Sequence, residues 1–503
     1  MKTILHLLGA LCVASITCGS PVHAAAPNIV IFLVDDMGVM DTSVPFLTDA
    51  TGAPKLHPLN EWYRTPNMER LAKQGIRFPQ FCAMSVCSPT RVSILTGQNP
   101  ARHHVTNWIN PDTNNHGPKG PRDWNWKGLD KNDTTLPKLL RQQGYRTIHV
   151  GKGHFGPNRT EGSDPVHLGF DVNIGGNSYG QPGSYYGEKN YGKGSKQAVP
   201  HLEAYHGSKT FLTEALTLEA NKQIDASIHD KKPFFLYFAQ YAVHAPFQAN
   251  PRFAAHYVNA EKPAAAQAFA TLIESMDESL GMLLDHLEKT GQAENTLVFF
   301  LGDNGSDAPL GEAHNVGSAA PLRGKKGSHY EGGMRVPFIA AWAKPAAANP
   351  HQQALPIPAN AVQPHLASVV DIFPTVLAAA EGKVPSSHPL DGQNLRVLLS
   401  GKDDPTHRDA FLMHYPHAPH RSDYWSSLRQ GEWKVIYHYL PQKNGQHYQL
   451  FHLKNDPYEQ NDLAAKEPAT LKRMMKNLID ALEQHKAQYP RDQEGKELRP
   501  VLP

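Results

Sequence analysis

The sequence predicts an α/β fold in which a large, mostly parallel sheet lies between layers of helices, and a smaller α+β domain follows at the C-terminus. Short apolar runs rich in β-branched and aromatic residues alternate along the chain with helical patterns. Such alternation favours parallel strands with helices on both faces of the sheet. The 503 residues are 40% hydrophobic and 19% charged, a composition typical of a globular protein.

The expected elements of the large domain follow from apolar runs and helix signals. Thr65-Pro66 offers a cap residue and a proline suited to the first helical turn, and Gly75 is suited to the end of that helix. Gly291 closes a long helical pattern in the same way. We expect strands at 28–34, 145–150, 233–238 and 297–301, and helices at 66–75, 135–144 and 264–290.

The chain is expected to divide into a catalytic domain over residues 27–400 and a C-terminal domain over residues 401–503. The segment Gly401-Lys402-Asp403-Asp404-Pro405 is typical of a connection. Beyond it we expect an antiparallel sheet, with strands near 433–437 and 449–451 and a closing helix at about 469–486.

Residues 1–26 have the layout of a secretory signal peptide, with one lysine, an apolar stretch and small residues at the end. A membrane anchor is the alternative, but the apolar run is shorter than the roughly 20 residues that a span requires. We find no later run of about 18 apolar residues and expect no membrane span. The signal peptide predicts a periplasmic or secreted protein.

The charge balance argues against nucleic acid as a partner. The chain has 49 Lys and Arg residues against 47 Asp and Glu residues, so its formal net charge is +2. Proteins that bind nucleic acid rely on basic residues to displace counterions from phosphates. We therefore expect no nucleic acid partner.

Polar residues follow two of the expected strands at the point where each strand ends. Asp35 and Asp36 come directly after residues 28–34, and Asp303 and Asn304 follow residues 297–301. Ligands of open α/β sheets bind beyond the carboxyl ends of the strands, so these side chains are expected to converge. Hard oxygen ligands favour Ca²⁺ or Mg²⁺ over Zn²⁺. The alternative is that both pairs only form turns.

Cys82 and Cys87 are the cysteines that remain after removal of the signal peptide. They are near enough in sequence for a short disulfide in an oxidising compartment. Cys87 also precedes Pro89, a residue suited to the start of a helix. A helix N-terminus with Arg91 nearby favours a bound anion and an activated side chain. A buried free cysteine is the alternative.

The segment Cys87-Ser88-Pro89-Thr90-Arg91, followed by Leu95-Thr96-Gly97, resembles the signature of the formylglycine-dependent, arylsulfatase-like sulfatases of the alkaline phosphatase superfamily. Gln98 departs from that family, which usually has Arg at this position. Further segments resemble other motifs of the family, in the family's order: residues 28–36, Gly151-Lys152-Gly153-His154, His244-Ala245-Pro246, and residues 301–305, 321–333 and 450–457. The resemblance covers most of the chain and implies a mixed, mostly parallel sheet of the alkaline phosphatase type.

The resemblance also implies a mechanism. A maturation enzyme would oxidise Cys87 to formylglycine, and one hydroxyl of the hydrated aldehyde would attack the sulfur of a sulfate ester. The second hydroxyl would then lose its proton to His154 and expel sulfate. The implied catalytic residues are Cys87, Arg91, Lys152, His154, His244 and Lys326, where Lys326 is preferred to Lys325 because it directly precedes Gly327.

The same resemblance implies a cation site. The ligands would be Asp35, Asp36, Asp303 and Asn304, together with the converted side chain of Cys87. Ca²⁺ is favoured over Mg²⁺.

Substrate-binding residues are expected in loops near these motifs. Trp108, Trp124 and Trp126 lie in an insert rich in Pro, Asn and Gly, and residues 175–194 form a second loop, rich in Gly, Tyr and Asn. Concentrated His, Arg and aromatic side chains suit an anionic sugar, and solvated loops are the alternative. The residues predicted to bind substrate are His103, His104, Trp108, His420 and Arg421, with His414 and His417 in the same cluster.

These observations predict a sulfatase that hydrolyses a sulfate ester of a sulfated carbohydrate. Two alternatives remain open. One is a phosphonate monoester or phosphodiester hydrolase of the same superfamily. The other is a non-catalytic relative that binds sulfated glycans, against which the complete set of basic motif residues argues.

Overall fold

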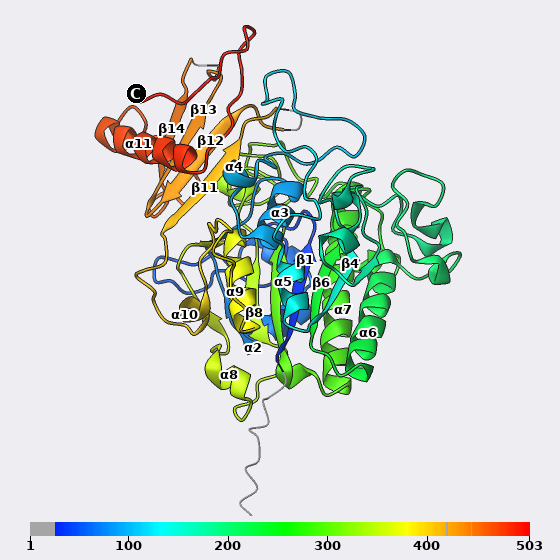
Figure 1. Ribbon diagram of the computed structural model, residues 1–503. Helices are drawn as coiled ribbons and strands as arrows, with labels where there is room; N and C mark the ends of the chain where they lie inside the picture. The colour runs from blue at the N-terminus through cyan, green and yellow to red at the C-terminus, as the bar shows by residue number, and fades with distance from the viewer. Residues whose placement is uncertain (1–25, 419–420, 444) are drawn as a thin grey trace, which may run out of the picture.

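The computed structural model describes residues 26–418, 421–443 and 445–503. An eight-stranded sheet forms the centre of the large domain, and helices cover both of its faces (Figure 1). From one edge to the other its strands are β5 (Val172–Ile174), β4 (Arg146–Gly151), β6 (Phe234–Gln240), β1 (Asn28–Val34), β7 (Thr296–Gly302), β8 (Phe338–Trp342), β2 (Ile76–Arg77) and β9 (Ala361–Val362).

The sheet is mixed and mostly parallel, as predicted. The five strands from β5 to β7 are parallel to one another, whereas β8 is antiparallel to both β7 and β2. The strands and helices expected in this domain are present, with ends that differ by a few residues from those expected. Its longer helices are α2 (Pro66–Gln74), α3 (Cys87–Thr96), α5 (Leu136–Gln142), α6 (Leu212–His229), α7 (Ala264–Lys289) and α9 (Ile372–Ala379).

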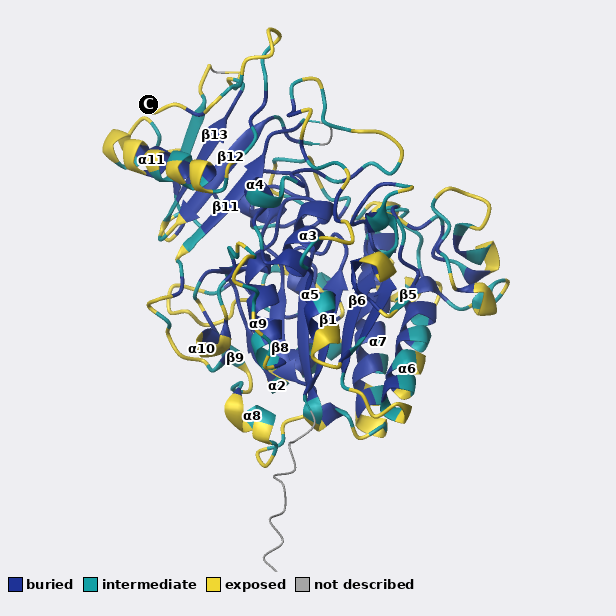
Figure 2. Cartoon of the chain, in the orientation of Figure 1, coloured by how far each residue is buried: buried dark blue, intermediate teal, exposed yellow. Residues whose placement is uncertain are grey.

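The sheet separates two hydrophobic cores because successive side chains of a strand point to opposite faces. In β1, Ile29, Ile31 and Leu33 pack into one core with residues of α3, α5 and α9. Val30, Phe32 and Val34 pack into the other, with residues of α2, α6 and α7. The central strands are buried along their whole length (Figure 2). A strand buried on both faces has to be apolar throughout, which is why its sequence shows no alternation.

A four-stranded antiparallel sheet follows at the C-terminus (Figure 1). Its strands, in spatial order, are β11 (Ala410–Tyr415), β12 (Trp425–Gln430), β13 (Trp433–His438) and β14 (Tyr448–His452). Helix α11 (Pro468–Gln484) covers one face through Leu471, Met475 and Leu478. We propose that the domain boundary lies between the end of α10 at Leu399 and the start of β11.

The remaining short elements connect these layers. Strands β3 and β10 form a separate parallel pair. The bounds are α1 (Pro58–Trp62), β3 (Phe81–Cys82), α4 (Pro100–His103), α8 (Pro350–Ala354), β10 (Ala367–Ser368) and α10 (Arg396–Leu399). Among the described residues, none of the helices combines the length and the hydropathy that a membrane crossing needs. All but the last residue of the expected signal peptide lie outside the described residues.

Candidate active site

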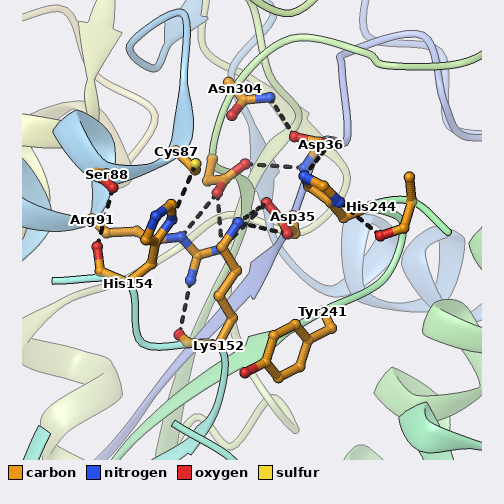
Figure 3. A network of polar contacts seen from close by, with 12 residues as sticks. Asp35, Asp36, Cys87, Ser88, Arg91, Lys152, His154, Tyr241, His244 and Asn304 are labelled. Carbon is orange, nitrogen blue, oxygen red and sulfur yellow. Dashed lines mark hydrogen bonds and ion pairs between the residues drawn. The ribbon is translucent and has the colours of Figure 1, made fainter. Parts of the chain in front are cut away.

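The two acidic segments meet at the carboxyl ends of neighbouring strands. Strands β1 and β7 pair in parallel, with Val34 opposite Gly302, so the residues that follow each strand lie side by side. Asp36 donates its backbone N–H to Asp303 Oδ1 at 3.0 Å. Carboxylate oxygens of Asp35, Asp36 and Asp303 lie within 4.8 Å of one another, and all three residues are buried (Figure 3).

Each of these carboxylates is paired with a buried cation. Arg91 donates from Nε and Nη2 to Asp303 Oδ2 at 3.0 and 2.8 Å. Lys152 Nζ lies 2.7 Å from both oxygens of Asp35. Lys326 Nζ lies 2.7 Å from Asp36 Oδ1. Burial acts to lower the pKa of Lys326, but the attraction of the Asp36 carboxylate outweighs it, so the pKa is raised and the ammonium stays charged.

The donor set fits a divalent cation. Asn304 donates from Nδ2 to Asp36 Oδ1 at 3.0 Å, while its own Oδ1 is buried and has no hydrogen-bond partner. A buried amide oxygen without a partner is unfavourable unless something coordinates it. This oxygen, beside three carboxylates, matches the hard oxygen ligands that Ca²⁺ and Mg²⁺ take in proteins.

Cys87 is the first residue of α3, where unpaired backbone N–H groups favour negative charge. Its Sγ lies 3.4 Å from Nδ1 of His154. The other ring nitrogen, Nε2, lies 2.7 Å from the carbonyl oxygen of Ile109 and donates its proton there, which leaves Nδ1 as an acceptor. Burial and then the nearby Lys152 ammonium hold the pKa of His154 well below its usual range, so the ring is neutral.

Local backbone structure aims these side chains. His154 follows β4 with φ of 63°, and Asp36 follows β1 with φ of 62°, both in the left-handed region that non-glycine residues rarely adopt. The N–H of His154 donates to the carbonyl of Asn177 at 2.9 Å. Ser88 Oγ donates to the carbonyl of His154 at 3.1 Å, which joins α3 to this turn.

His244 approaches the acidic cluster from the loop after β6. Its Nε2 lies 3.5 Å from Asp36 Oδ2, and its Nδ1 lies 2.8 Å from the carbonyl of Ala245. Burial and the Lys326 ammonium together lower the pKa of His244 to about 4, against the opposing pull of Asp36. The six residues implied as catalytic and the four implied as protein ligands of the cation therefore come together in one network. Figure 3 shows most of it and labels Asp35, Asp36, Cys87, Arg91, Lys152, His154, His244 and Asn304.

A cavity of about 360 Å³ opens above this network. Its floor is lined by Cys87, His154, His244 and Lys326. Most of its walls come from two loop segments, one around Trp108 and one around Tyr179. The wall residues are Trp108, Asn110, Pro111, Asp112, Tyr179, Gly180, Gln181, Lys196 and Gln197.

Of the residues predicted to bind substrate, Trp108 lines this cavity, whereas His103 and His104 do not. His103 Nε2 lies 3.1 Å from Ser93 Oγ, and His104 Nε2 lies 3.0 Å from the carbonyl of Lys486. Arg421 forms a bidentate pair with Asp307. His420 lies outside the described residues.

The other expected rim residues contribute to the interior instead. The Trp124 side chain is buried, and its Nε1 donates to Asn114 Oδ1 at 2.7 Å. Trp126 packs against the hydrophobic core, and its Nε1 donates to the carbonyl of Asn110 at 2.9 Å. His414 and His417 are fully buried. His417 contacts the insert that carries Trp108 through Thr106 and the Trp124 ring, whereas His414 contacts Ser426 and the carbonyl of Gln488. None of these four side chains lines the cavity.

The Cys82–Cys87 disulfide considered from the sequence does not form, and both cysteines are free. Cys82 lies in β3, where its Sγ contacts the carbonyl of Gln80 at 3.9 Å, whereas Cys87 faces His154. Sequence reasoning also missed part of the cavity wall. Asn110 and Asp112 were not singled out within their insert, and Lys196 and Gln197 lie just beyond the predicted second loop. Polar residues of these kinds are common in loops, so the sequence does not distinguish the ones that line the cavity from their neighbours.

Comparison with known proteins identifies the family. The model of the family described as "Sulfatase" matches residues 27–383, and "N-sulphoglucosamine sulphohydrolase, C-terminal" matches residues 325–488. The chain is 31% identical over 392 residues to N-acetylgalactosamine-6-sulfatase of Mus musculus, covering 75% of this chain and 67% of that protein. It is 30% identical over 452 residues to arylsulfatase G of Mus musculus, and the match covers 82% of this chain and 76% of that protein.

Solved structures agree on the fold. The crystal structure of Ps i-CgsB has a TM-score of 0.70 at 26% identity and covers 91% of this chain and 93% of its own. The phosphonate monoester hydrolase of Agrobacterium radiobacter has a TM-score of 0.61 at 18% identity, and the match covers 91% of this chain and 96% of that chain. At this identity the likeness concerns the fold alone. With the fold, the motif residues and the family model in agreement, this chain belongs to the sulfatase family, the sulfuric ester hydrolases of the alkaline phosphatase fold.

Proposed function

We propose that this sulfatase hydrolyses a sulfate ester of a sulfated carbohydrate, with Cys87 converted to formylglycine as the nucleophile. The position of Cys87 carries the proposal. It lies on the floor of the cavity at the N-terminus of α3, with its Sγ 3.4 Å from the acceptor nitrogen of His154. On this proposal, the sulfur stands in for an oxygen of the converted side chain.

A carbohydrate substrate is supported by the relatives and by the cavity. One curated relative is named N-acetylgalactosamine-6-sulfatase. A solved structure of Ps i-CgsB, with a TM-score of 0.70 and 26% identity, is in complex with k-i-k-neocarrahexaose. Trp108 and Tyr179 line the cavity beside side-chain amides, the combination of apolar faces and polar groups that orients small ligands.

The roles of the chain's own residues follow from their places around Cys87. His154 accepts a proton at Nδ1 from the hydroxyl that is to expel sulfate, and Nε2 stays bonded to the carbonyl of Ile109. His244 and Lys326 bind sulfate oxygens, and one of them protonates the leaving oxygen. Arg91 and Lys152 provide positive charge near the nucleophile. Formylglycine itself, once hydrated, supplies one hydroxyl that attacks sulfur and a second that releases sulfate.

We propose that Asp35, Asp36, Asp303, Asn304 and the converted Cys87 hold a divalent cation, Ca²⁺ in preference to Mg²⁺. A cation of this kind polarises the oxygens that it binds and stabilises developing charge. The unpartnered Oδ1 of Asn304 and the close carboxylates support this assignment.

The first experiment is peptide mass spectrometry on the tryptic fragment that contains Cys87, from protein made in its natural host. Conversion to formylglycine lowers the peptide mass by about 18 Da, because an aldehyde replaces the thiol. Release of sulfate from sulfated oligosaccharides by the converted protein, and its loss in Cys87→Ala, is the expected result. Active protein that carries an unmodified thiol would rule out the formylglycine mechanism.

Paired kinetics separate the alternatives. Aryl sulfate and aryl phosphate esters with the same leaving group should give a much higher kcat/KM for the sulfate. A marked preference for the phosphate ester would identify a phosphoryl hydrolase. Retained glycan binding without turnover, in protein with confirmed conversion at Cys87, would identify a binding protein.

We also propose that the protein is periplasmic or secreted and that a formylglycine-generating enzyme is its maturation partner. Residues 1–26 carry the pattern of a signal peptide. Sequencing of the mature N-terminus should find cleavage near residue 26, and an intact N-terminus would contradict export by this route.

A further inference from the structure

The walls of the active-site cavity are bonded to one another. We call residues 104–130 the first insert and residues 175–200 the second insert. Lys196 Nζ of the second insert lies 3.0 Å from Asp112 Oδ2 of the first. Asn158 Nδ2, from the loop after β4, donates to Asp112 Oδ1 at 3.0 Å and to the hydroxyl of Tyr179 at 2.9 Å. Asp112 is therefore the point at which three loop segments meet.

Further hydrogen bonds join each insert to a neighbouring segment of the chain. In the second insert, the Tyr185 hydroxyl lies 2.8 Å from the carbonyl oxygens of both Tyr241 and His244 and shares its proton with them, which joins that insert to the loop after β6. In the first insert, Asn107 Oδ1 accepts a hydrogen bond from Tyr415 of β11 at 3.0 Å. The segments around the cavity are thus bonded to one another at several points.

The size of the cavity limits what it holds. A polymer bound along its length needs an open path on both sides of the reacting group, whereas a terminal unit needs only one opening. The volume of about 360 Å³ lies at the lower end of the roughly 300–1,000 Å³ typical of small-molecule sites. This volume suits one sulfated sugar unit, with the rest of the molecule outside.

The chemistry of the wall points to the same occupant. Among the described residues that line the cavity above its floor, Asp112 and Lys196 carry charge, and they neutralise each other. Asn110, Gln181 and Gln197 offer amide groups, which bond sugar hydroxyls without favouring a further anionic group.

We propose that the Asp112–Lys196 ion pair is a specificity determinant that closes the cavity and confines sulfate removal to one sugar unit at the end of a chain. This inference rests on the proposed function. The pair is exposed, with 44% and 72% of the two side chains accessible, so it acts by closing a path and not by adding much stability. Removal of either partner breaks the direct contact between the two inserts and opens the rim there to a longer chain.

The test compares two sulfated oligosaccharides of equal length, one with its sulfate on the terminal unit and one with its sulfate on an internal unit. Wild-type protein, with formylglycine confirmed, should favour the terminal sulfate by about 100-fold or more in kcat/KM. Lys196→Ala and Asp112→Ala should each lower this ratio by about tenfold, because the internal sulfate gains access. Lys344→Ala is the control, since it breaks a comparably exposed ion pair with Glu294, just before the start of β7, and should leave the ratio unchanged.

Equal release of terminal and internal sulfate by the wild-type protein would overturn the inference, as would a ratio that neither rim variant changes. 4-Nitrophenyl sulfate, which requires only the floor of the cavity, separates this failure from failure of the proposed function. Converted wild-type protein that hydrolyses no sulfate ester at all would overturn the proposed function, and the inference with it.

Discussion

Gly180 provides a sharp test of the geometry around His154. A Cβ added at Gly180 would lie 2.7 Å from Cε1 and 2.9 Å from Nδ1 of the His154 imidazole. Ordinary van der Waals contact between carbon atoms needs roughly 3.5–4.0 Å, so the ring has to move by about 1 Å. The φ angle of Gly180 is not in the left-handed region, so Gly180→Ala changes packing without adding backbone strain.

A displacement of about 1 Å at a reacting group lowers the rate by about 100-fold, or about 2.7 kcal/mol at 1.36 kcal/mol per tenfold change. We therefore expect Gly180→Ala to lower kcat for 4-nitrophenyl sulfate by about two orders of magnitude. The melting temperature should change little, because the clash affects one side chain beside an open cavity. Steady-state kinetics measure this effect, together with mass spectrometry to show equal conversion at Cys87.

Gly311→Ala is the matched control. An added Cβ there would meet its nearest neighbour, the Cα of Gly317, at 3.3 Å, and the backbone has no positive φ. This variant should retain wild-type kcat. Wild-type kcat in fully converted Gly180→Ala would refute the assignment of His154 as a base that must hold its present position.

The remaining predictions concern the cation, a buried ion cluster and acid stability. Addition of Ca²⁺ to chelated protein should raise the free energy of unfolding by about 2.7 kcal/mol at 100 times its Kd, and Asp303→Asn should abolish this gain in a thermal melt. Lys434 Nζ lies 3.1 Å from Glu331 and 2.7 Å from Glu459, all buried, so Lys434→Met should lower the free energy of unfolding by about 3–5 kcal/mol in a urea titration. Burial and then Arg91 lower the pKa of His149 to about 3, so the folded state binds a proton less readily than the unfolded chain. The free energy of unfolding should therefore fall as the pH drops from about 6.5 towards 3, by up to about 1.36 kcal/mol per pH unit for this side chain. His149→Phe should reduce this fall, measured by urea titrations at pH 7 and pH 5.

Each of these three predictions has a control variant and an outcome that would contradict it. Asp480→Asn, in an exposed pair with Lys476, should leave both the Ca²⁺ response and the stability unchanged. His229→Phe replaces a histidine whose side chain is 89% exposed and should keep the wild-type pH dependence. A Ca²⁺ response in Asp303→Asn, a Lys434→Met protein of wild-type stability, or a His149→Phe protein with unaltered acid sensitivity would each contradict the corresponding argument.

The strands, and the meeting of the acidic segments at their ends, could be predicted because the signals for them are local. The run at 28–34 is apolar at every position, which is what burial on both faces of a sheet demands, and β1 occupies these residues. Ligands of open α/β sheets bind at the carboxyl ends of the strands, so the sequence alone is enough to predict that Asp35 and Asp303 lie together.

The substrate loops could not be predicted in the same way. Trp108 and Trp124 lie in one insert and have the same side chain, yet one lines the cavity and the other is buried. Nothing within a Pro- and Asn-rich segment sets which way each ring faces, because that depends on segments far away in the chain, such as His417, whose ring lies 5.0 Å from that of Trp124.

The sequence by itself determined the fold class, the order of the motif residues and the chemistry that those residue types support. Apolar periodicity and strand ends are properties of neighbouring residues, so one chain is enough to reveal them. The tertiary structure alone decided that Cys82 and Cys87 stay apart and that Asp112 meets Lys196 across the rim. Contacts between distant segments depend on how loops pack upon the finished sheet, and the energy of that packing has no signature in any single stretch of sequence.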